Sequence, residues 1–214
     1  MTITGHQGQR LLLAQAVRPA AGEGQDRVAV VRVGEAVVLS VADGSGGASG
    51  GAEAADRSIR LVTDEAHLHR MDDERVWAKL VARIDADADH QSGQCALVIA
   101  AVHQDVITGA SAGDCGAWLI RDDIEDLTEQ QVRKPLVGSG SAVPVEFRRT
   151  LGGGTLLLAS DGLLKYARRK DIARIALRQD LHAAAQELVQ LPELRSGDVP
   201  DDVSVVLCRA QTGR

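Results

Sequence analysis

The chain has 214 residues, of which 44% are hydrophobic and 25% charged, the balance of a soluble globular protein long enough to bury a core. Aromatic residues make up only 2%, which predicts an aliphatic core and argues against a surface that stacks single-stranded nucleic acid. The net charge is −6, so no nucleic-acid partner is expected.

The first half of the chain predicts strands, followed by helical sequence. Residues 11–17, 27–33 and 36–41 are apolar runs of strand length, and Gly34-Glu35 is a plausible hairpin turn between the last two. Residues 43–55 are rich in Gly, Ala and Ser, but they follow a strand directly and lead into helical sequence, so we do not interpret them as a linker. Residues 74–88 carry apolar side chains at helical spacing and predict an amphipathic helix.

The second half begins with another predicted hairpin and ends with helices and a strand. Strands are predicted at 96–102 and 105–110, with a turn at His103-Gln104, while residues 122–140 are predicted to be mostly loop. Residues 171–191 are predicted to be two helices, with Asp180 capping the second. Further strands are predicted at 116–120, 145–150, 155–159 and 203–208, and the second and third of these flank a Gly152-Gly153-Gly154 turn.

The predicted strands come mostly as hairpins and do not alternate with helices. This order favours antiparallel sheets with helices packed outside, an α+β layered sandwich, over a doubly wound parallel sheet. No internal repeat and no dividing linker is present, so we expect a single domain over residues 1–214.

The cysteines and the apolar runs bear on the cellular compartment in which the protein is expected. The three cysteines are an odd number without a Cys-x-x-Cys pair, which fits a reducing environment better than a disulfide framework. The first ten residues have no apolar core of a signal peptide, and no apolar run reaches membrane-spanning length. We therefore expect a cytoplasmic protein without a membrane partner.

Four aspartates share one local context, because each lies at the edge of a predicted strand. An Asp before Gly at a strand end is commonly just a turn residue, so the case rests on the four together. Convergent carboxylates would repel one another unless a divalent cation lay between them, and oxygen ligands suit Mg²⁺ or Mn²⁺. Gly44 lacks a Cβ atom, so its carbonyl can approach a metal closely. The four are Asp26, Asp43, Asp161 and Asp201.

Several segments resemble, in the same order, the signature blocks of type 2C metal-dependent serine/threonine protein phosphatases, the PPM family, in their short bacterial form. The most specific block is Leu-Ala-Ser-Asp-Gly-Leu at 158–163, and Asp-Gly-x-Gly-Gly at 43–47 is next. The resemblance spans about residues 10 to 208. The other matching segments are Gln25-Asp26, Gly113-Asp114-Cys115 and 201–206, with Leu127-Thr128 and 135–138 similar to the family's flap region.

The resemblance implies a four-layer sandwich of two antiparallel β-sheets flanked by α-helices, with two Mn²⁺ or Mg²⁺ ions and a third held more weakly. Asp43 would bridge the two metals and Gly44 would offer its carbonyl to one. Asp161 and Asp201 would bind the other metal, and these three aspartates would serve catalysis. Asp26, or Gln25 beside it, would support the second metal, and Asp114 would help the third.

The activity that the resemblance implies is hydrolysis of phosphoserine and phosphothreonine by a metal-activated water, with no covalent intermediate. The expected partner is a phosphorylated protein, either a kinase target or the kinase itself. The family's usual phosphate-binding Arg falls near Ala21, and the closest Arg is Arg18. Either Arg18 reaches in through a shifted loop, or the activity is low, or substrates bind differently.

Four other positions differ from the family pattern. Gln25 stands where many relatives have Glu, Ser45 where some have a His that acts as an acid, Cys115 in place of a common Ser, and Asp202 in place of a common Asn. The helical region over 52–90 is also short and irregular for the family. The main alternative is a pseudophosphatase, catalytically weak or inactive, that binds a phosphoprotein or a partner. A nucleotide-binding fold is a further alternative, but Ser49 stands where the third Gly of the dinucleotide motif belongs. No Gly-Lys-Ser/Thr follows the Gly-rich stretch, which excludes a P-loop.

Overall fold

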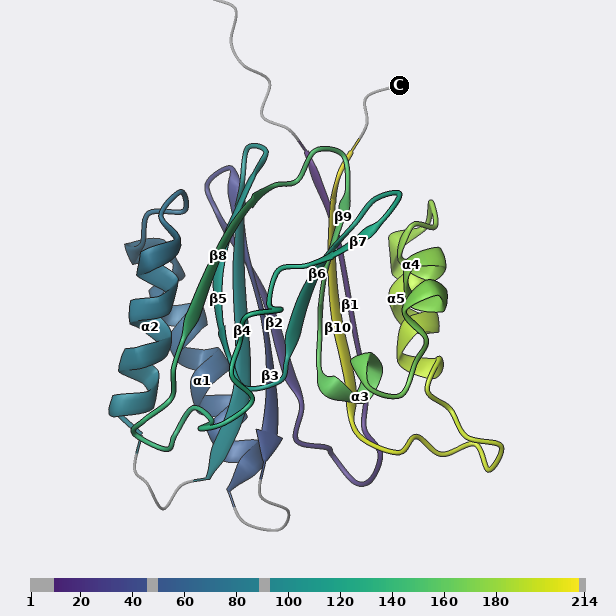
Figure 1. Ribbon diagram of the computed structural model, residues 1–214, viewed down its shortest axis with the longest axis horizontal. Helices are drawn as coiled ribbons and strands as arrows, with labels where there is room; N and C mark the ends of the chain where they lie inside the picture. Colours follow the sequence, from purple (N-terminus) through teal and green to yellow (C-terminus); the bar gives the residue numbers. More distant parts are fainter. Residues whose placement is uncertain (1–9, 46–49, 89–92, 212–214) are drawn as a thin grey trace, which may run out of the picture.

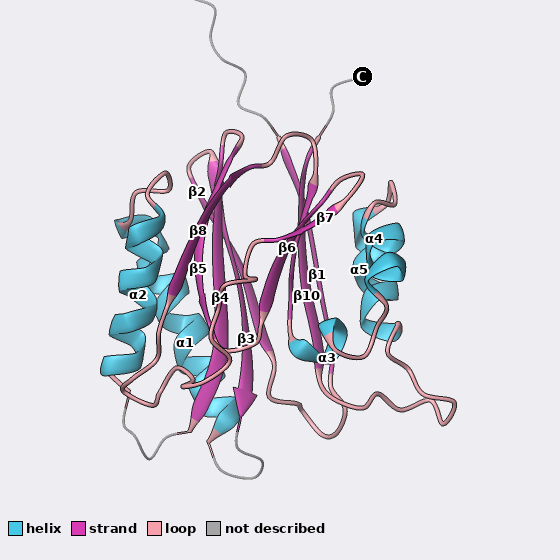
Figure 2. Ribbon diagram, viewed as in Figure 1, coloured by secondary structure: helices cyan, strands magenta, loops and turns pink. Residues whose placement is uncertain are grey.

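Two five-stranded antiparallel sheets pack face to face, and helices cover their outer faces (Figures 1 and 2). The computed structural model describes residues 10–45, 50–88 and 93–211; Gly46, Gly47 and Ser49 of the Gly-rich stretch lie outside the described residues. The four-layer α+β sandwich is therefore confirmed. Among the described residues no helix combines the length and apolarity needed to cross a membrane.

The first sheet has the strand order β1-β10-β9-β6-β7 and pairs the first strand with the last. β1 pairs with β10 along its whole length, from Leu11 opposite Ala210 to Arg18 opposite Val203. The strands are β1 (Leu11–Arg18), β6 (Gly116–Ile120), β7 (Ile124–Asp126), β9 (Thr155–Ala159) and β10 (Val203–Ala210).

The second sheet has the strand order β2-β3-β4-β5-β8 and is built from successive hairpins with β8 added at one edge. The predicted turn at Gly34-Glu35 joins β2 to β3, and the β4–β5 turn falls one residue later than predicted, at Gln104-Asp105. The strands are β2 (Arg27–Val33), β3 (Ala36–Ser45), β4 (Gln94–His103), β5 (Val106–Ala112) and β8 (Val145–Thr150).

Helices lie on the outer face of each sheet. α1 and α2 cover the second sheet, and α4 and α5 cover the first (Figure 1). Asp180 caps α5 by accepting a hydrogen bond from the Ala183 amide, as the sequence predicted. The helices are α1 (Gly51–Glu65), α2 (Glu74–Ala86), α3 (Asp161–Leu164), α4 (Arg169–Ala176) and α5 (Leu181–Gln190), with a 3₁₀ turn η1 (Ala66–Leu68).

The central strands are apolar on both faces because each face packs against another layer. In β3, Leu39 points into the core between the sheets, whereas Val38 packs under α1 and α2. In β9, Leu158 faces the other sheet and Leu157 faces the helices of its own side. The sequence therefore shows continuous aliphatic runs in place of a strict apolar–polar alternation.

The structure adds to or differs from the sequence-based predictions at several points. β3 does not end at Val41 but continues through Ser45, because its pairing with β4 continues past Asp43 and Gly44. β8 and β9 flank the glycine turn, yet they belong to different sheets, so this turn crosses between the layers. Within residues 52–88, the described part of the region expected to be short and irregular for the family, α1 and α2 are joined by the 3₁₀ turn η1.

The observed sheet topology also removes one alternative. Every strand pairing in the described part of the chain is antiparallel, so it contains no βαβ unit to hold a dinucleotide. α1 does follow the Gly-rich stretch, but it packs back on β3 and β4 of the antiparallel sheet.

Candidate functional site

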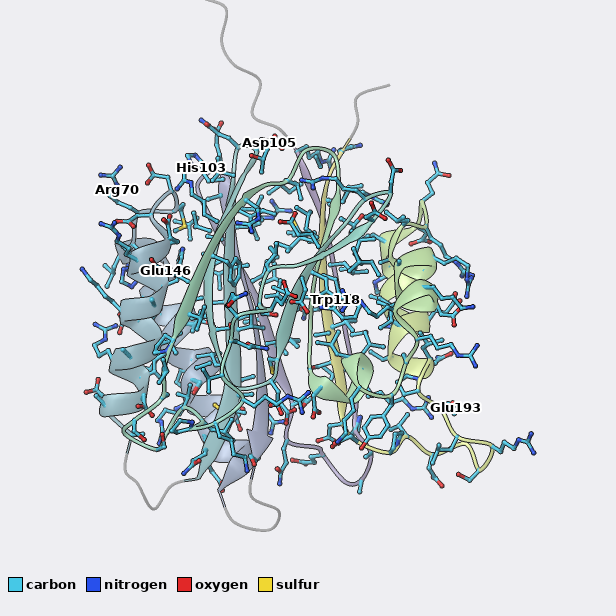
Figure 3. The ribbon with its side chains drawn as sticks, viewed as in Figure 1. Arg70, His103, Asp105, Trp118, Glu146 and Glu193 are labelled. Carbon is cyan, nitrogen blue, oxygen red and sulfur yellow. The ribbon has the colours of Figure 1, made fainter. Side chains whose placement is uncertain are left out.

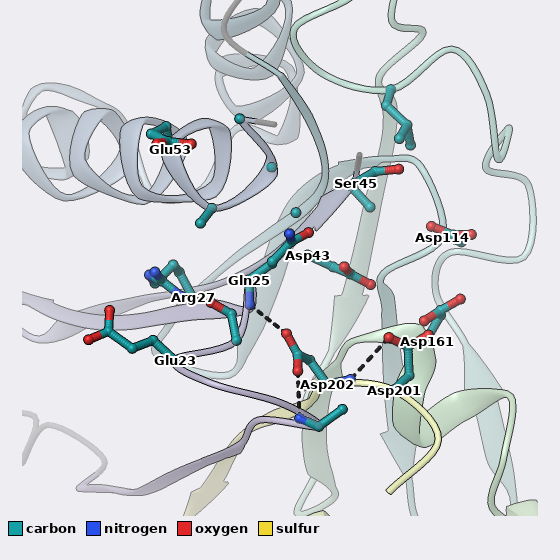
Figure 4. A pocket seen from close by; sticks show the side chains of 18 of the residues that line it. Glu23, Gln25, Arg27, Asp43, Ser45, Glu53, Asp114, Asp161, Asp201 and Asp202 are labelled. Atoms are coloured by element: carbon teal, nitrogen blue, oxygen red, sulfur yellow. Dashed lines mark hydrogen bonds between the residues drawn. The ribbon is translucent and has the colours of Figure 1, made fainter. Parts of the chain in front are cut away.

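A cleft of about 850 Å³ opens at one end of the sandwich, where β3 ends and α3 begins. Asp43, Asp114, Asp161 and Asp201 line this cleft. In Figure 4 their carboxylates point toward a common space, although they come from three different connections and one strand. The structure thus brings together side chains that are up to about 160 residues apart in the sequence.

Asp43 and Gly44 are held in the cleft by the continuation of β3. Asp43 pairs with Ala96 and Gly44 with Cys95 of β4, so their backbone is fixed by the sheet. A Cβ atom on Gly44 would overlap the carbonyl group of Gly51 at the start of α1. Only glycine therefore allows α1 to begin this close to the strand while the Gly44 backbone still lines the cleft.

Asp161 and Asp201 come from two adjoining turns of the first sheet. Asp161 opens α3 directly after β9, and Asp201 lies just before β10, which pairs with β9. Ser160 ties the turns together, because its amide donates to the Ser204 carbonyl and its hydroxyl accepts from the Ser204 amide. The two carboxylates are therefore placed by the hydrogen bonds between the neighbouring strands.

The cleft carboxylates perturb one another strongly. The pKa of Asp43 is raised from 3.8 to about 9. Burial is the largest cause, followed by the negative charges of Asp26, Asp161, Asp201 and Asp114. Burial, Asp114 and Asp201 also raise the pKa of Asp161, and Lys165 and Arg133 oppose this shift. Such mutual repulsion is what a divalent cation relieves.

Asp26 lies beneath the cleft and is not among the residues that line it. Its side chain is buried, and neither carboxylate oxygen completes a hydrogen bond with any residue that the structure describes. Burial raises the pKa of Asp26 to about 6, although the nearby hydroxyls of Ser160 and Ser204 lower it in part. Gln25, its neighbour, does line the cleft.

The donor set fits hard divalent cations. It consists of carboxylate oxygens and a glycine backbone carbonyl, the ligand types that Mg²⁺ and Mn²⁺ prefer. In the conformation described for residues 10–45, 50–88 and 93–211, no three acidic, His or Cys side chains are already grouped as ligands. Two observations favour the cations nonetheless: the raised pKa of Asp43 and the unpartnered carboxylate of Asp26.

Arg18 does not reach the cleft. Its guanidinium donates to Glu193, which lies on the loop after α5 (Figure 3), and to the Gly197 carbonyl, at 2.7 Å each. The idea that Arg18 enters through a shifted loop is therefore wrong for this conformation. Arg27 lines the cleft, but its guanidinium is held by Asp56 and by backbone carbonyls.

Asp202 has a positioning role that the sequence did not reveal. Its carboxylate accepts hydrogen bonds from the amides of Ala20, at 2.7 Å, and Gln25, at 2.5 Å (Figure 4). It thereby fastens the β1–β2 loop to the turn that carries Asp201. The only sequence signal was the adjacent acidic pair before a strand, which is weak alone.

Gly162 offers a test of how closely these turns must pack. A Cβ atom there would overlap the Asp202 carbonyl oxygen and would lie 3.4 Å from the Asp201 Cβ. We expect Gly162→Ala to lower the free energy of unfolding by about 2 kcal/mol and to weaken metal binding. Gly34→Ala, at a turn with φ 60° and open space, should cost about 1 kcal/mol but leave metal affinity unchanged. Denaturant unfolding and calorimetry measure both effects, and equal metal affinity in the two variants would contradict the packing argument.

Solved structures of bacterial proteins share this fold. The serine/threonine phosphatase of S. agalactiae superposes with a TM-score of 0.80 at 18% identity, covering 94% of this chain and 100% of that one. Stp1 from Staphylococcus aureus, a serine/threonine phosphatase, gives 0.79 at 18% identity over 95% and 96%. The Mycobacterium tuberculosis serine/threonine phosphatase PstP/Ppp gives 0.73 at 20% identity over 94% and 99%. A comparison with curated proteins found no match.

The two-sheet sandwich with its acidic cleft is the fold of the type 2C, or PPM-type, phosphatases, which confirms the resemblance seen in the sequence. Within this class, the family model of stage II sporulation protein E (SpoIIE) matches residues 34–211. The chain belongs to the SpoIIE family.

Proposed function

We propose that this protein is a metal-dependent phosphatase that hydrolyses phosphoserine and phosphothreonine in proteins. The observation that carries the proposal is the convergence of four aspartates on one cleft, with the pKa of Asp43 raised by its carboxylate neighbours. The family membership and the names of the structures with the same fold support the same activity.

The residues of the cleft would divide the work as follows. Asp43 would bridge two Mn²⁺ or Mg²⁺ ions, the Gly44 carbonyl would bind one of them, and Asp161 and Asp201 would bind the other. The bound metals would supply a hydroxide nucleophile near neutral pH and neutralise charge on the phosphoryl oxygens. Asp114 would assist a weaker third ion, and Asp26 or Gln25 would support the second.

Several structural features prepare these side chains for the reaction. β3 and the paired turns fix the backbone of the ligands, so ion binding would move their side chains and not the strands that carry them. Asp202 holds the β1–β2 loop, and with it Gln25, against the cleft. The cleft is open to solvent at one end of the sandwich, which suits a phosphorylated side chain presented by another protein.

The expected partner is a phosphorylated protein, either a kinase target or the kinase itself. The cytoplasm is the proposed compartment, because Cys95, Cys115 and Cys208 are all free and buried and no disulfide framework is built from them. Burial raises the pKa of Cys95 to about 11 and that of Cys208 to about 12, so these thiols remain protonated and inert.

A pseudophosphatase is the second candidate, because Arg18 is bound elsewhere and Arg27 is already paired. Hydrolysis of p-nitrophenyl phosphate and of a phosphoserine peptide with Mn²⁺ or Mg²⁺ separates the two. The phosphatase proposal requires turnover that EDTA stops and that Asp161→Ala lacks. Equal, negligible rates in the native protein and in Asp161→Ala would leave only the binding role.

Metal binding should also be visible without any substrate. We expect saturating Mn²⁺ or Mg²⁺, at about 100 times the dissociation constant, to raise the melting temperature by about 5–10 °C, because the ions bind only the folded cleft. Asp161→Ala should fold normally but lose most of this increase. A melting temperature that does not respond to millimolar concentrations of either ion would count against the metal site.

A further inference from the structure

A phosphatase cleft built from aspartates needs a cation that holds the substrate's phosphoryl group beside the metals. The segment near Ala21 that lines the cleft offers no Arg, and the nearby guanidinium groups are engaged. Arg18 is paired with Glu193. Arg27 is paired with Asp56 at 2.7 Å and also donates to two carbonyls. A side-chain cation for the phosphoryl group would therefore come from another part of the cleft.

The loop between β7 and β8 carries two adjacent cations, of which one reaches the cleft. Lys134 lines the cleft together with Asp43, Asp114 and Asp161. Arg133 is the preceding residue of the same loop. Both side chains are exposed, and neither forms a hydrogen bond or ion pair with any residue that the structure describes. These two cations are thus available to a ligand.

The loop that carries them is anchored on both sides. Before the pair, the Gly113 amide donates to the Val132 carbonyl at 3.3 Å. After it, Val137 exchanges two backbone hydrogen bonds with Cys95 of β4, at 2.9 and 3.0 Å. Cys95 is the partner of Gly44 in the sheet, so the loop is tied to the strand that carries Asp43. Lys134 is therefore held at the cleft and does not project from a free surface loop.

A second anchor comes from α2. The buried carboxylate of Asp85 accepts hydrogen bonds from the amides of Gly138, Gly140 and Ala142, at 2.7, 3.0 and 2.9 Å. Three backbone donors on one carboxylate fix the return of the loop to β8. The position of Lys134 consequently depends on contacts with both the second sheet and its covering helix.

We propose that Lys134, assisted by Arg133, binds the phosphoryl group of the substrate and takes the place of the Arg that the β1–β2 loop lacks. This inference rests on the phosphatase function proposed above. Because an ammonium group binds phosphate as a point charge and not through a rigid fork, we expect tolerance of substrate orientation and a strong dependence on salt.

The test compares Lys134→Met and the double variant Lys134→Met/Arg133→Met with the native protein, each loaded with Mg²⁺. Two readouts are used: KM and kcat for a phosphoserine peptide, and the affinity for inorganic phosphate measured by calorimetry. We expect Lys134→Met to weaken phosphate binding and raise KM by about tenfold or more, and the double variant to lose further affinity. kcat should change less than KM, because the groups that attack phosphorus are untouched.

Two further variants serve as controls. Lys134→Arg keeps the charge and should restore most of the affinity. Lys170→Met removes an exposed lysine of α4 on the far side of the first sheet and should leave KM and phosphate affinity unchanged. All the replaced side chains are exposed, so each variant is expected to fold, which its melting temperature verifies.

The outcomes separate this inference from the phosphatase proposal. If the native protein hydrolyses the peptide and the double variant matches it in KM and phosphate affinity, the assignment of Lys134 and Arg133 is wrong while the phosphatase proposal stands. If the native protein shows no turnover, the phosphatase proposal fails. In that case the affinity for inorganic phosphate still tests the role of Lys134. Weaker phosphate binding by the double variant than by the native protein supports this role. A native protein that binds no phosphate overturns it.

Discussion

Asp43→Asn should abolish phosphatase activity and, at the same time, make the metal-free protein more resistant to heat. The loss of kcat/KM is expected to be about three orders of magnitude or more, because a ligand shared by two metals contributes several kcal/mol to the transition state. The gain in stability has a separate cause. Asp43 is crowded by the carboxylates of Asp26, Asp161, Asp201 and Asp114, and burial also opposes its ionisation.

The sign of the stability effect follows from the raised pKa. The Asp43 carboxyl has a pKa of about 9 in the folded protein, against an ordinary value of 3.8, so it binds its proton more tightly when the chain is folded. Between pH 3.8 and about 9, a range that includes neutral pH, the folded protein holds a proton that the unfolded chain has released. The free energy of unfolding therefore falls as the pH rises through this range. An amide carries no charge, so we expect Asp43→Asn to raise the metal-free melting temperature by about 4 °C at pH 7.

Asp64→Asn is the matched control, because Asp64 is an exposed aspartate of α1 without an ion pair among the described residues. It should change neither the rate nor the melting temperature noticeably. Differential scanning calorimetry in EDTA and peptide hydrolysis with Mn²⁺ measure the two effects. Full activity in Asp43→Asn, or a lower metal-free melting temperature than that of the native protein, would contradict the site as described.

Asp85→Ala should destabilise the fold and also impair the cleft, although Asp85 does not line it. The variant leaves the amides of Gly138, Gly140 and Ala142 without their buried acceptor. We expect a loss of about 3 kcal/mol, or about 6–12 °C in melting temperature, from hydrogen bonds to a charged group. We also expect KM for a phosphopeptide to rise, because the freed loop no longer holds Lys134 in place.

Asp87→Ala changes the same residue type one position beyond the end of α2, where the side chain is exposed. It should lower the melting temperature by less than about 2 °C and leave KM unchanged. A KM for Asp85→Ala equal to that of Asp87→Ala, measured at a temperature where both are folded, would show that the loop does not depend on this carboxylate.

Local patterns predicted most of the strands, and pairing between distant segments explains where they failed. β2, β6, β8 and β9 have the predicted bounds; β2, β6 and β9 are apolar runs closed by residues that favour turns, whereas β8 is largely polar and is followed by the glycine turn. The pair Asp43-Gly44 is also typical of a turn, yet the backbone pairing of β3 with β4 keeps both residues in the strand. Likewise, nothing local shows that the glycine turn after β8 connects two different sheets.

For the candidate site, the sequence predicted the acidic residues but not the residues that hold them. Asp43, Asp161 and Asp201 were predicted from their positions beside strands, and Asp114 from the family resemblance alone; all four line the cleft. Asp26, by contrast, lies below the cleft and does not line it. Asp85 was missed although one signal was present: it follows Val81 by four residues, on the buried face of a helix where a charge needs partners.

The start of β1 lies beside the end of β10, and this has a consequence for engineering. The first and last strands are neighbours, and the Gln211 amide donates to the Arg10 carbonyl at 2.7 Å. Figure 1 shows the start of β1 and the end of β10 at the top of the sandwich, at the end away from α3. A circular permutant that joins these ends with a short linker should keep every strand pairing intact. A fluorophore or an immobilising tether attached there would leave the route of a phosphoprotein to the aspartates open.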